Sequence, residues 1–116
     1  MGYTAVTLII GHGIDVVDLA EFERLLSMPA DHLLSRCFTG PEISYASDGP
    51  HRVQRLAARF AAKEAVLKSL GTGWVSGISW KDIEVRSDAG GRPSIKVTGE
   101  VARLAASRRI GHFLVV

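Results

Sequence analysis

The amino-acid sequence predicts an α+β fold in which a mostly antiparallel sheet packs against one long central helix. Three observations favour this fold class. Residues 52–70 form the longest uninterrupted helical pattern in the chain. Residues 78–86 and 93–99 alternate apolar and polar side chains on either side of a glycine-rich turn. The predicted strands are not regularly interleaved with crossover helices, which argues against a doubly wound parallel sheet.

The composition is that of a folded soluble protein. The chain has 116 residues, of which 47% are hydrophobic and 22% charged, so we expect one domain over residues 1–116. The net charge of +2 is too small to indicate nucleic-acid binding by itself. The apolar N-terminus is short, interrupted by polar residues and glycine, and lacks a basic region, so neither a membrane span nor a signal peptide is predicted. We therefore expect a cytoplasmic protein.

Cysteine and histidine usage excludes two further kinds of site. The single cysteine, Cys37, cannot form an internal disulfide bond, and its apolar neighbours favour an inert buried side chain over a nucleophile. The four histidines are scattered, with no spacing typical of a zinc site.

The N-terminal region is predicted to form a strand and then a helix. Residues 6–17 are rich in valine and isoleucine, which favours a strand with a bend at residues 11–13. Residues 19–28 carry large apolar side chains at helical spacing, and Pro29 ends this helix.

Two shorter helical segments are expected next. Residues 32–37 are predicted to form a helical turn. The sequence T-G-P-E that starts at Thr39 is typical of a capping box, in which Thr39 and Glu42 satisfy free backbone N–H groups. A helix over residues 40–46 follows, and the loop-forming residues 47–51 lead into the long helix.

The long helix over residues 52–70 has apolar residues on two faces. One face carries large side chains, and the opposite face carries small ones, which predicts that a second element packs closely against the small face. The large residues are Leu56, Phe60, Leu67 and Leu70, and the small ones are Ala58, Ala62, Ala65 and Ser69.

Charged residues occupy the two flanks of this helix. One flank is a basic stripe, whose simplest interpretation is a solvated edge; it consists of Arg52, Arg55, Arg59 and Lys63. On the other flank Glu64 and Lys68 are neighbours at a spacing of four residues. Taken alone, this pair is best interpreted as a surface salt bridge worth about 0.3–0.5 kcal/mol.

The C-terminal half is predicted to continue with a loop, a hairpin, a helix and a strand. Gly71 is well placed to end the long helix. The further elements are a loop at 71–77, strands at 78–86 and 93–99 joined by a turn at 87–93, a helix at 100–109 and a last strand at 112–116.

Two features suggest that the Glu64–Lys68 flank is more than a surface salt bridge. Asp15 lies within an apolar segment, where a carboxylate needs a cation, hydrogen-bond donors or exposure. The glycines of the G-T-G sequence at residues 71–73 allow backbone N–H groups to approach a phosphate. Together with Glu64, Lys68 and the basic stripe, these features suggest a metal–phosphate site, for which Mg²⁺ with its preference for carboxylate and phosphate oxygens is the natural ion.

Several motifs resemble those of one enzyme family. The stretches G-H-G-I-D-V-V-D-L, R-C-F-T-G-P-E-I-S-Y-A and R-L-A-A-R-F-A-A-K-E-A-V-L-K-S-L-G-T-G follow one another in this order, and I-S-W-K-D-I-E-V-R and the hairpin come after them. Over almost all of residues 10–116 the chain resembles the holo-[acyl-carrier-protein] synthases, which are small 4′-phosphopantetheinyl transferases. The K-E-A-containing motif is the most specific of these matches.

The resemblance implies an activity and an assembly. Such enzymes transfer the 4′-phosphopantetheine arm of coenzyme A to a serine of an apo acyl carrier protein, in a Mg²⁺-dependent reaction that releases adenosine 3′,5′-bisphosphate. They have the 4′-phosphopantetheinyl transferase fold and form homotrimers with active sites between subunits. Coenzyme A, the carrier protein and Mg²⁺ are therefore the expected partners, and neither nucleic acid nor a membrane is expected.

The resemblance also implies roles for particular residues. Asp15 and Glu64 are expected to hold the metal, and Lys68 to face the phosphates. A second set is expected to contact coenzyme A; it comprises Arg59, the loop residues Gly71, Thr72 and Gly73, and the turn residues Gly91, Arg92 and Pro93.

The proton acceptor for the carrier serine follows from charge. The Glu64 carboxylate one turn away stabilises the charged form of Lys68, so we expect Lys68 to stabilise charge on the transferred group. Glu64, or a water on the metal, is the better candidate for the base. Asp15, Glu64 and Lys68 are thus the predicted catalytic residues.

The chain departs from the family pattern at two places. Glu21 stands where the family commonly has an arginine that docks the acidic carrier protein, and we expect Arg24, one turn on, to take that role. After the segment G-H-F-L-V-V, the serine–histidine element and following strand of the family are expected to be missing.

Two other functions compete with this interpretation. One is a non-catalytic module of the same fold that binds coenzyme A or a carrier protein. The other is an RNA-binding domain that uses the basic stripe, which the small net charge and the lack of interleaved aromatic residues disfavour.

Overall fold

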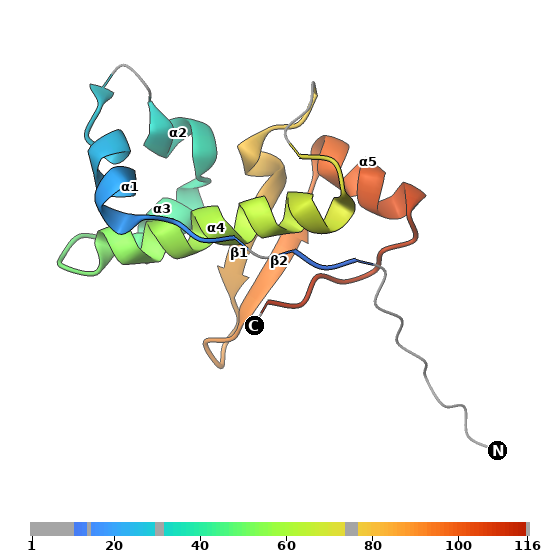
Figure 1. The fold of residues 1–116 in the computed structure, drawn as a ribbon. Helices are drawn as coiled ribbons and strands as arrows, with labels where there is room; N and C mark the ends of the chain where they lie inside the picture. The colour runs from blue at the N-terminus through green and yellow to red at the C-terminus, as the bar shows by residue number, and fades with distance from the viewer. Residues whose placement is uncertain (1–10, 14, 30–31, 74–76, 116) are drawn as a thin grey trace.

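The computed structural model describes residues 11–13, 15–29, 32–73 and 77–115 (Figure 1). The elements follow one another in the predicted order, with helices gathered around the longest one and a small antiparallel sheet beside it. They are α1 Leu19–Leu26, α2 Leu33–Cys37, α3 Gly40–Ala46, α4 Arg52–Leu70, the 3₁₀ turn η2 Trp80–Asp82, β1 Ile83–Ser87, β2 Pro93–Val97 and α5 Gly99–Ser107. The mixed α and β composition that the sequence predicted is confirmed.

The helix ends have the physical causes that the sequence indicated. In α3 the capping box is present, because Thr39 accepts from the Glu42 N–H and Glu42 accepts from the Thr39 N–H. α4 spans the predicted 19 residues. It ends at Gly71, whose φ of 72° lies in the left-handed region that favours glycine. The predicted bounds of α3 and α4 are therefore confirmed.

The sheet is a two-stranded antiparallel hairpin in the described part of the chain. Ile83 is opposite Val97, and Ser87 is opposite Pro93. The predicted hairpin is confirmed, but its first strand begins five residues later than residue 78. The preceding Trp80–Asp82 segment is a 3₁₀ turn, capped by Ser79 and Asp82.

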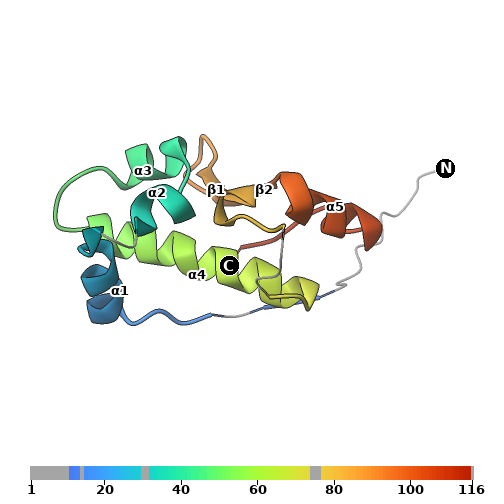
Figure 2. The same ribbon diagram turned by 90° about the horizontal axis from the view of Figure 1, so that it is seen from above.

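Two predicted strands are wrong over their described residues. Residues 11–13 and 15–17 form no strand, and neither do residues 112–115; the remaining residues of both predictions lie outside the described part. The first segment instead runs alongside α4 (Figure 2). The last one follows α5 and contributes Phe113 to a core cluster. Only part of their apolar surface is covered, since Val17 and Phe113 pack against the core clusters while Val16 and Leu114 are exposed.

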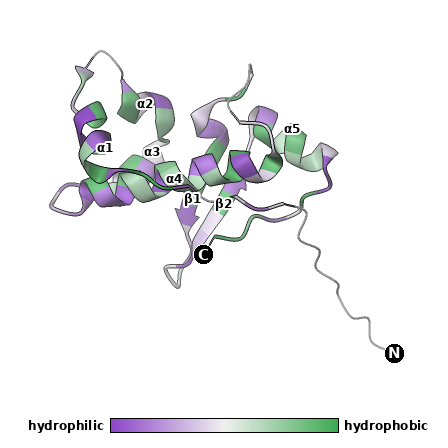
Figure 3. Cartoon of the chain, in the orientation of Figure 1, coloured by the Kyte–Doolittle hydropathy of each residue, from purple (hydrophilic) through white to green (hydrophobic). Residues whose placement is uncertain are grey.

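The core consists of two apolar clusters along α4. The first cluster gathers α1, α2 and α3 against the N-terminal half of α4, around Phe22, Phe38 and Leu56. The second packs the hairpin and α5 against the C-terminal half of α4, around Leu67 and Ile83. Figure 3 shows the resulting mixture of apolar and polar residues along α4. A long helix shared by both clusters thus joins the two halves of the molecule.

Cys37 belongs to the first cluster. Its side chain is buried, and this burial raises the pKa of the thiol to about 11. The predicted inert packing role is consistent with both observations, because the thiolate is the reactive form.

The small-residue face of α4 is covered by the N-terminal segment. A Cβ at Gly11 would overlap the backbone oxygen of Ser69, and a Cβ at Gly13 would overlap that of Ala65. Only glycine permits so close an approach. The prediction that a second element packs closely against Ala65 and Ser69 is confirmed.

In the described ranges, no helix combines the length and apolar character that crossing a membrane would need.

We predict that Gly13→Ala lowers the thermal unfolding midpoint, because the added methyl group forces the segment off α4 at a cost of about 1–3 kcal/mol. Gly40→Ala is the matched control, since a Cβ at Gly40, in the first turn of α3, meets nothing within 4 Å. Thermal unfolding followed by circular dichroism checks both variants. Equal midpoints for the two would contradict the close approach.

Candidate functional site

Asp15 and Lys68 meet although 53 residues separate them in the sequence. The Lys68 ammonium donates a hydrogen bond of 2.6 Å to Asp15 Oδ1. The Asp15 side chain is 16% exposed and that of Lys68 is 51% exposed. Gly13, two residues before Asp15, lies against Ala65 in the same region of α4. The packing of the N-terminal segment on α4 thus places the Asp15 carboxylate on the flank that carries Lys68.

Glu64 lies one helical turn before Lys68 on this flank. Residues four apart on a helix are neighbours, and the Glu64 side chain is half-buried. The G-T-G loop, of which residues 71–73 are described, begins directly after α4. Asp15 thus contacts the flank of α4 that carries Glu64 and Lys68, and the glycine loop starts at the end of the same helix.

The chemistry of these side chains fits a hard divalent cation. The described residues contain no group of three or more histidine, cysteine, aspartate or glutamate side chains that could hold a metal ion by themselves. Mg²⁺ does not need such a cage, because it is commonly bound by one or two carboxylates together with water and substrate phosphates. Asp15 and Glu64 supply that number of carboxylates.

Arg59 has a different environment from the other predicted site residues. It is only 7% exposed, and its guanidinium carbon lies 3.9 Å from the centre of the Tyr45 ring on α3. Its Nε is buried without a hydrogen-bond partner in the described chain. Hydrogen bonds with Ser87 and with Arg59 lower the pKa of the Tyr45 hydroxyl. A buried donor without an acceptor is costly, so Arg59 retains a capacity to bind an anionic group.

The predicted turn residues lie at the tip of the β1–β2 hairpin. The Asp88 carboxylate accepts from the Gly90 and Arg92 N–H groups and so shapes the turn. Residues 91–93 are exposed. In Figures 1 and 2 this tip points away from the C-terminal end of α4. The protomer therefore does not bring residues 91–93 to the Asp15–Lys68 site.

Arg24, the predicted docking residue, is exposed on α1. Its side chain is 56% exposed and makes an ion pair of 2.5 Å with Glu21, the residue that departs from the family pattern. Its Nη1 also contacts the Met28 sulfur at 3.3 Å. Glu21 thus offsets part of the positive charge that docking would use.

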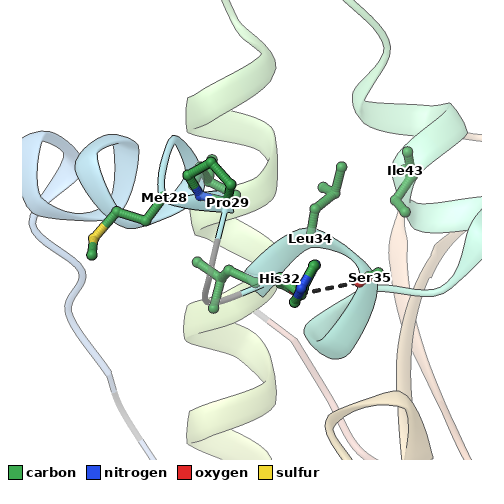
Figure 4. Close-up of a pocket in the computed structure, with 8 residues that line it drawn as sticks. Met28, Pro29, His32, Leu34, Ser35 and Ile43 are labelled. Atoms are coloured by element: carbon green, nitrogen blue, oxygen red, sulfur yellow. Dashed lines mark hydrogen bonds between the residues drawn. The ribbon is translucent and has the colours of Figure 1, made fainter.

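A shallow apolar pocket of about 280 Å³ lies next to this helix (Figure 4). It opens between the end of α1, α2 and α3, and none of its lining residues is a predicted catalytic or coenzyme-binding residue. The lining residues are Leu26, Met28, Pro29, His32, Leu33, Leu34, Ser35 and Ile43.

The sequence missed one buried ion pair. Lys63 and Glu42 have no exposed side-chain surface, and the Lys63 ammonium lies 2.7 Å from Glu42 Oε1. The interpretation of the basic stripe as a solvated edge is wrong for Lys63 and Arg59, and the RNA-binding hypothesis loses both residues. The helical spacing could have predicted the burial of Lys63, because this residue lies between Phe60 and Leu67 on the large-residue face of the helix.

Comparisons with known proteins place the chain in a family. The family model described as the 4′-phosphopantetheinyl transferase superfamily matches residues 11–112. A holo-[acyl-carrier-protein] synthase of Geobacter sp. (strain M21) is 45% identical over 104 residues, which are 90% of this chain and 83% of that protein.

Solved structures of such enzymes have the same fold. The holo-[acyl-carrier-protein] synthase of Neisseria meningitidis matches with a TM-score of 0.78 and 30% identity over 90% of this chain and 84% of that one. That of Bacillus anthracis strain Ames, in complex with CoA (3′,5′-ADP), matches with a TM-score of 0.69 and 37% identity over 79% and 78%. The chain therefore belongs to the 4′-phosphopantetheinyl transferase superfamily and is related within it to the holo-[acyl-carrier-protein] synthases.

Proposed function

We propose that this protein transfers the 4′-phosphopantetheine arm of coenzyme A to a serine hydroxyl of an apo acyl carrier protein. The products are the holo carrier protein and adenosine 3′,5′-bisphosphate. The observation that carries the proposal is the contact of Asp15 with Lys68, on the flank of α4 that also bears Glu64. Because the chain belongs to the 4′-phosphopantetheinyl transferase superfamily, phosphopantetheine transfer is the reaction that we assign to this arrangement.

The diphosphate of coenzyme A binds at the start of the glycine loop and beside Lys68. Lys68 is half exposed, so its ammonium can leave Asp15 and face a phosphate oxygen. Phosphoryl transfer is catalysed mainly by positioning and by neutralising charge on the transferred group. Lys68 supplies that neutralisation, while the backbone of Gly71, Thr72 and Gly73 runs along the cofactor.

Asp15 and Glu64 are the residues that would hold Mg²⁺. The ion, when bound, neutralises the diphosphate and makes the adenosine bisphosphate a better leaving group. Asp15 is suited to this role because its carboxylate is only 16% exposed and lies on the flank of α4 that carries Lys68. Glu64 lies one turn of α4 before Lys68, the residue that contacts Asp15.

The serine oxygen of the carrier protein attacks the phosphorus that bears the pantetheine arm. The bond between that phosphorus and the oxygen of the adenosine 5′-phosphate breaks, and the electron pair leaves with adenosine 3′,5′-bisphosphate. Glu64 takes the serine proton, since Lys68 is used to neutralise charge on the transferred group.

The nucleotide end of coenzyme A contacts Arg59 and the hairpin turn at residues 91–93. Arg59 has a buried Nε available for an anionic group. The turn lies away from the Asp15–Lys68 site of its own protomer (Figure 1), which favours a homotrimer in which the turn of one subunit completes the site of its neighbour.

The carrier protein docks on α1. Carrier proteins of this kind are acidic, so the exposed Arg24 is the expected contact. The apolar pocket beside Met28 offers the adjoining apolar surface (Figure 4). A non-catalytic module that binds coenzyme A or the carrier protein is the alternative, and binding of both without turnover would favour it.

Glu64→Gln is expected to lower kcat at least about 100-fold, because the amide neither accepts the proton nor binds the metal well. Transfer of labelled pantetheine to an apo carrier protein in Mg²⁺ measures this. Glu100→Gln on α5 is the matched control and should keep the wild-type rate. A normal rate for Glu64→Gln would mean that the assigned site is wrong.

Arg24→Ala is expected to raise KM for the carrier protein about threefold, with kcat unchanged, because an exposed charge contributes up to about 1 kcal/mol. Glu21→Ala should lower KM, because it removes the carboxylate that pairs with Arg24. Both effects should shrink as salt rises. Steady-state kinetics at low and high salt test them, and a KM that neither variant changes would refute docking through Arg24.

A further inference from the structure

We propose that Lys63 and Glu42 are positioning residues for the transfer reaction: their buried ion pair fixes the rotation of α4 about its axis and thereby sets where Glu64 and Lys68 face Asp15. This inference rests on the proposed function, since it concerns residues that do not themselves touch the substrates.

The Lys63 ammonium is enclosed by acceptors from four elements or their ends. It donates to the backbone oxygens of Cys37 at 2.7 Å, Trp80 at 3.1 Å and Ile83 at 2.7 Å, and to Glu42 Oε1 at 2.7 Å. These acceptors belong to α2, η2, β1 and α3. One side chain of α4 is therefore tied to most of the elements that pack around it.

Glu42 accepts hydrogen bonds from two further backbone groups. Its Oε1 accepts from the Thr39 N–H at 2.9 Å, and its Oε2 accepts from the Val85 N–H at 3.0 Å. The same carboxylate caps α3, pairs with α4 and holds β1. Burial lowers the pKa of Lys63, and the hydrogen bond from Lys63 to Glu42 opposes that effect and favours the charged ammonium.

The position of the pair on α4 explains why a charged tie is used. The first apolar cluster reaches Phe60, the second begins at Val66, and Lys63 lies between them. The hydrophobic effect that drives apolar contacts is non-directional. Hydrogen bonds weaken steeply when their angle changes. The ammonium thus supplies directional contacts at the place on the ridge where the two clusters adjoin.

The proposed catalytic side chains are sensitive to such a turn. Glu64 directly follows Lys63, so the two side chains differ by about 100° around the helix. A rotation of about 20° moves a side-chain end that lies about 6 Å from the helix axis by about 2 Å. A displacement of about 1 Å at a reacting centre can cost on the order of 100-fold in rate. A small rotation of α4 is therefore enough to break the contact of Lys68 with Asp15 and to displace Glu64.

The test compares two variants of the pair with a core variant of the same helix. Lys63→Met keeps the length of the side chain and removes the ammonium, and Glu42→Gln keeps the shape and removes the charge. Leu56→Ala is the control, because Leu56 is fully buried on α4 but contacts neither partner through a hydrogen bond. For each variant the thermal unfolding midpoint is measured first. Both kcat and KM are then measured at a temperature well below that midpoint.

The positioning role predicts a loss of kcat that stability does not explain. Lys63→Met and Glu42→Gln should lower kcat at least about 30-fold when fully folded, whereas Leu56→Ala should stay within about twofold of the wild type despite its lower midpoint. A kcat for the pair variants equal to that of Leu56→Ala would overturn the proposal. Where a variant is partly unfolded, sucrose restores the folded state. Recovery of kcat along with the folded fraction would also overturn the proposal, and a persistently low kcat would support it.

Calorimetry separates this proposal from the proposed function. The affinity for coenzyme A in Mg²⁺ should fall at least about tenfold in Lys63→Met and remain within about twofold in Leu56→Ala. If the wild-type protein binds coenzyme A but transfers nothing, the proposed function fails, and the affinities still decide the positioning role. Equal affinities in the two variants would overturn it.

Discussion

The close contact between the N-terminal segment and α4 is the constraint on which the candidate site depends. Asp15 reaches Lys68, 53 residues later, because the backbone of the N-terminal segment lies directly against the backbone of α4. Glycine at positions 11 and 13, opposite Ala65 and Ser69, makes that approach possible. The resulting ion pair between Asp15 and Lys68 is the product of backbone packing and of complementary charge together.

α4 is held on two sides by different physical means. On one side, small residues admit the N-terminal segment, and on the other, two apolar clusters and the Lys63–Glu42 pair bind the shorter helices and the hairpin. A buried ion pair adds little stability over a well-packed apolar pair. Its position at the junction of the two clusters fits the proposed orienting role, because hydrogen bonds are directional and the hydrophobic effect is not.

The sequence predicted the local structure well and the long-range contacts less well. The capping box at Thr39 and the left-handed Gly71 fix helix ends through neighbouring residues, so they could be recognised without the fold. The strands expected at residues 6–17 and 112–116 depend on a partner strand, which a local richness in apolar and β-branched residues cannot reveal. Lys63 was taken as solvated because its acceptors at Cys37, Trp80 and Ile83 come from segments 17 to 26 residues away.

At the candidate site, the approach of Asp15 to the α4 flank was predicted from charge and motif. The stacking of Arg59 on Tyr45 was not predicted.

The central claim is that Asp15 and Glu64 bind one divalent ion together with the diphosphate of coenzyme A. A crystal structure with coenzyme A and Mg²⁺, with Mn²⁺ substituted to locate the ion by anomalous scattering, tests it most directly. The account predicts oxygens of both carboxylates about 2.1 Å from the same ion, with Lys68 moved from Asp15 to a phosphate. An ion bound without either carboxylate, or Asp15 still paired with Lys68 while the diphosphate lies elsewhere, would contradict it.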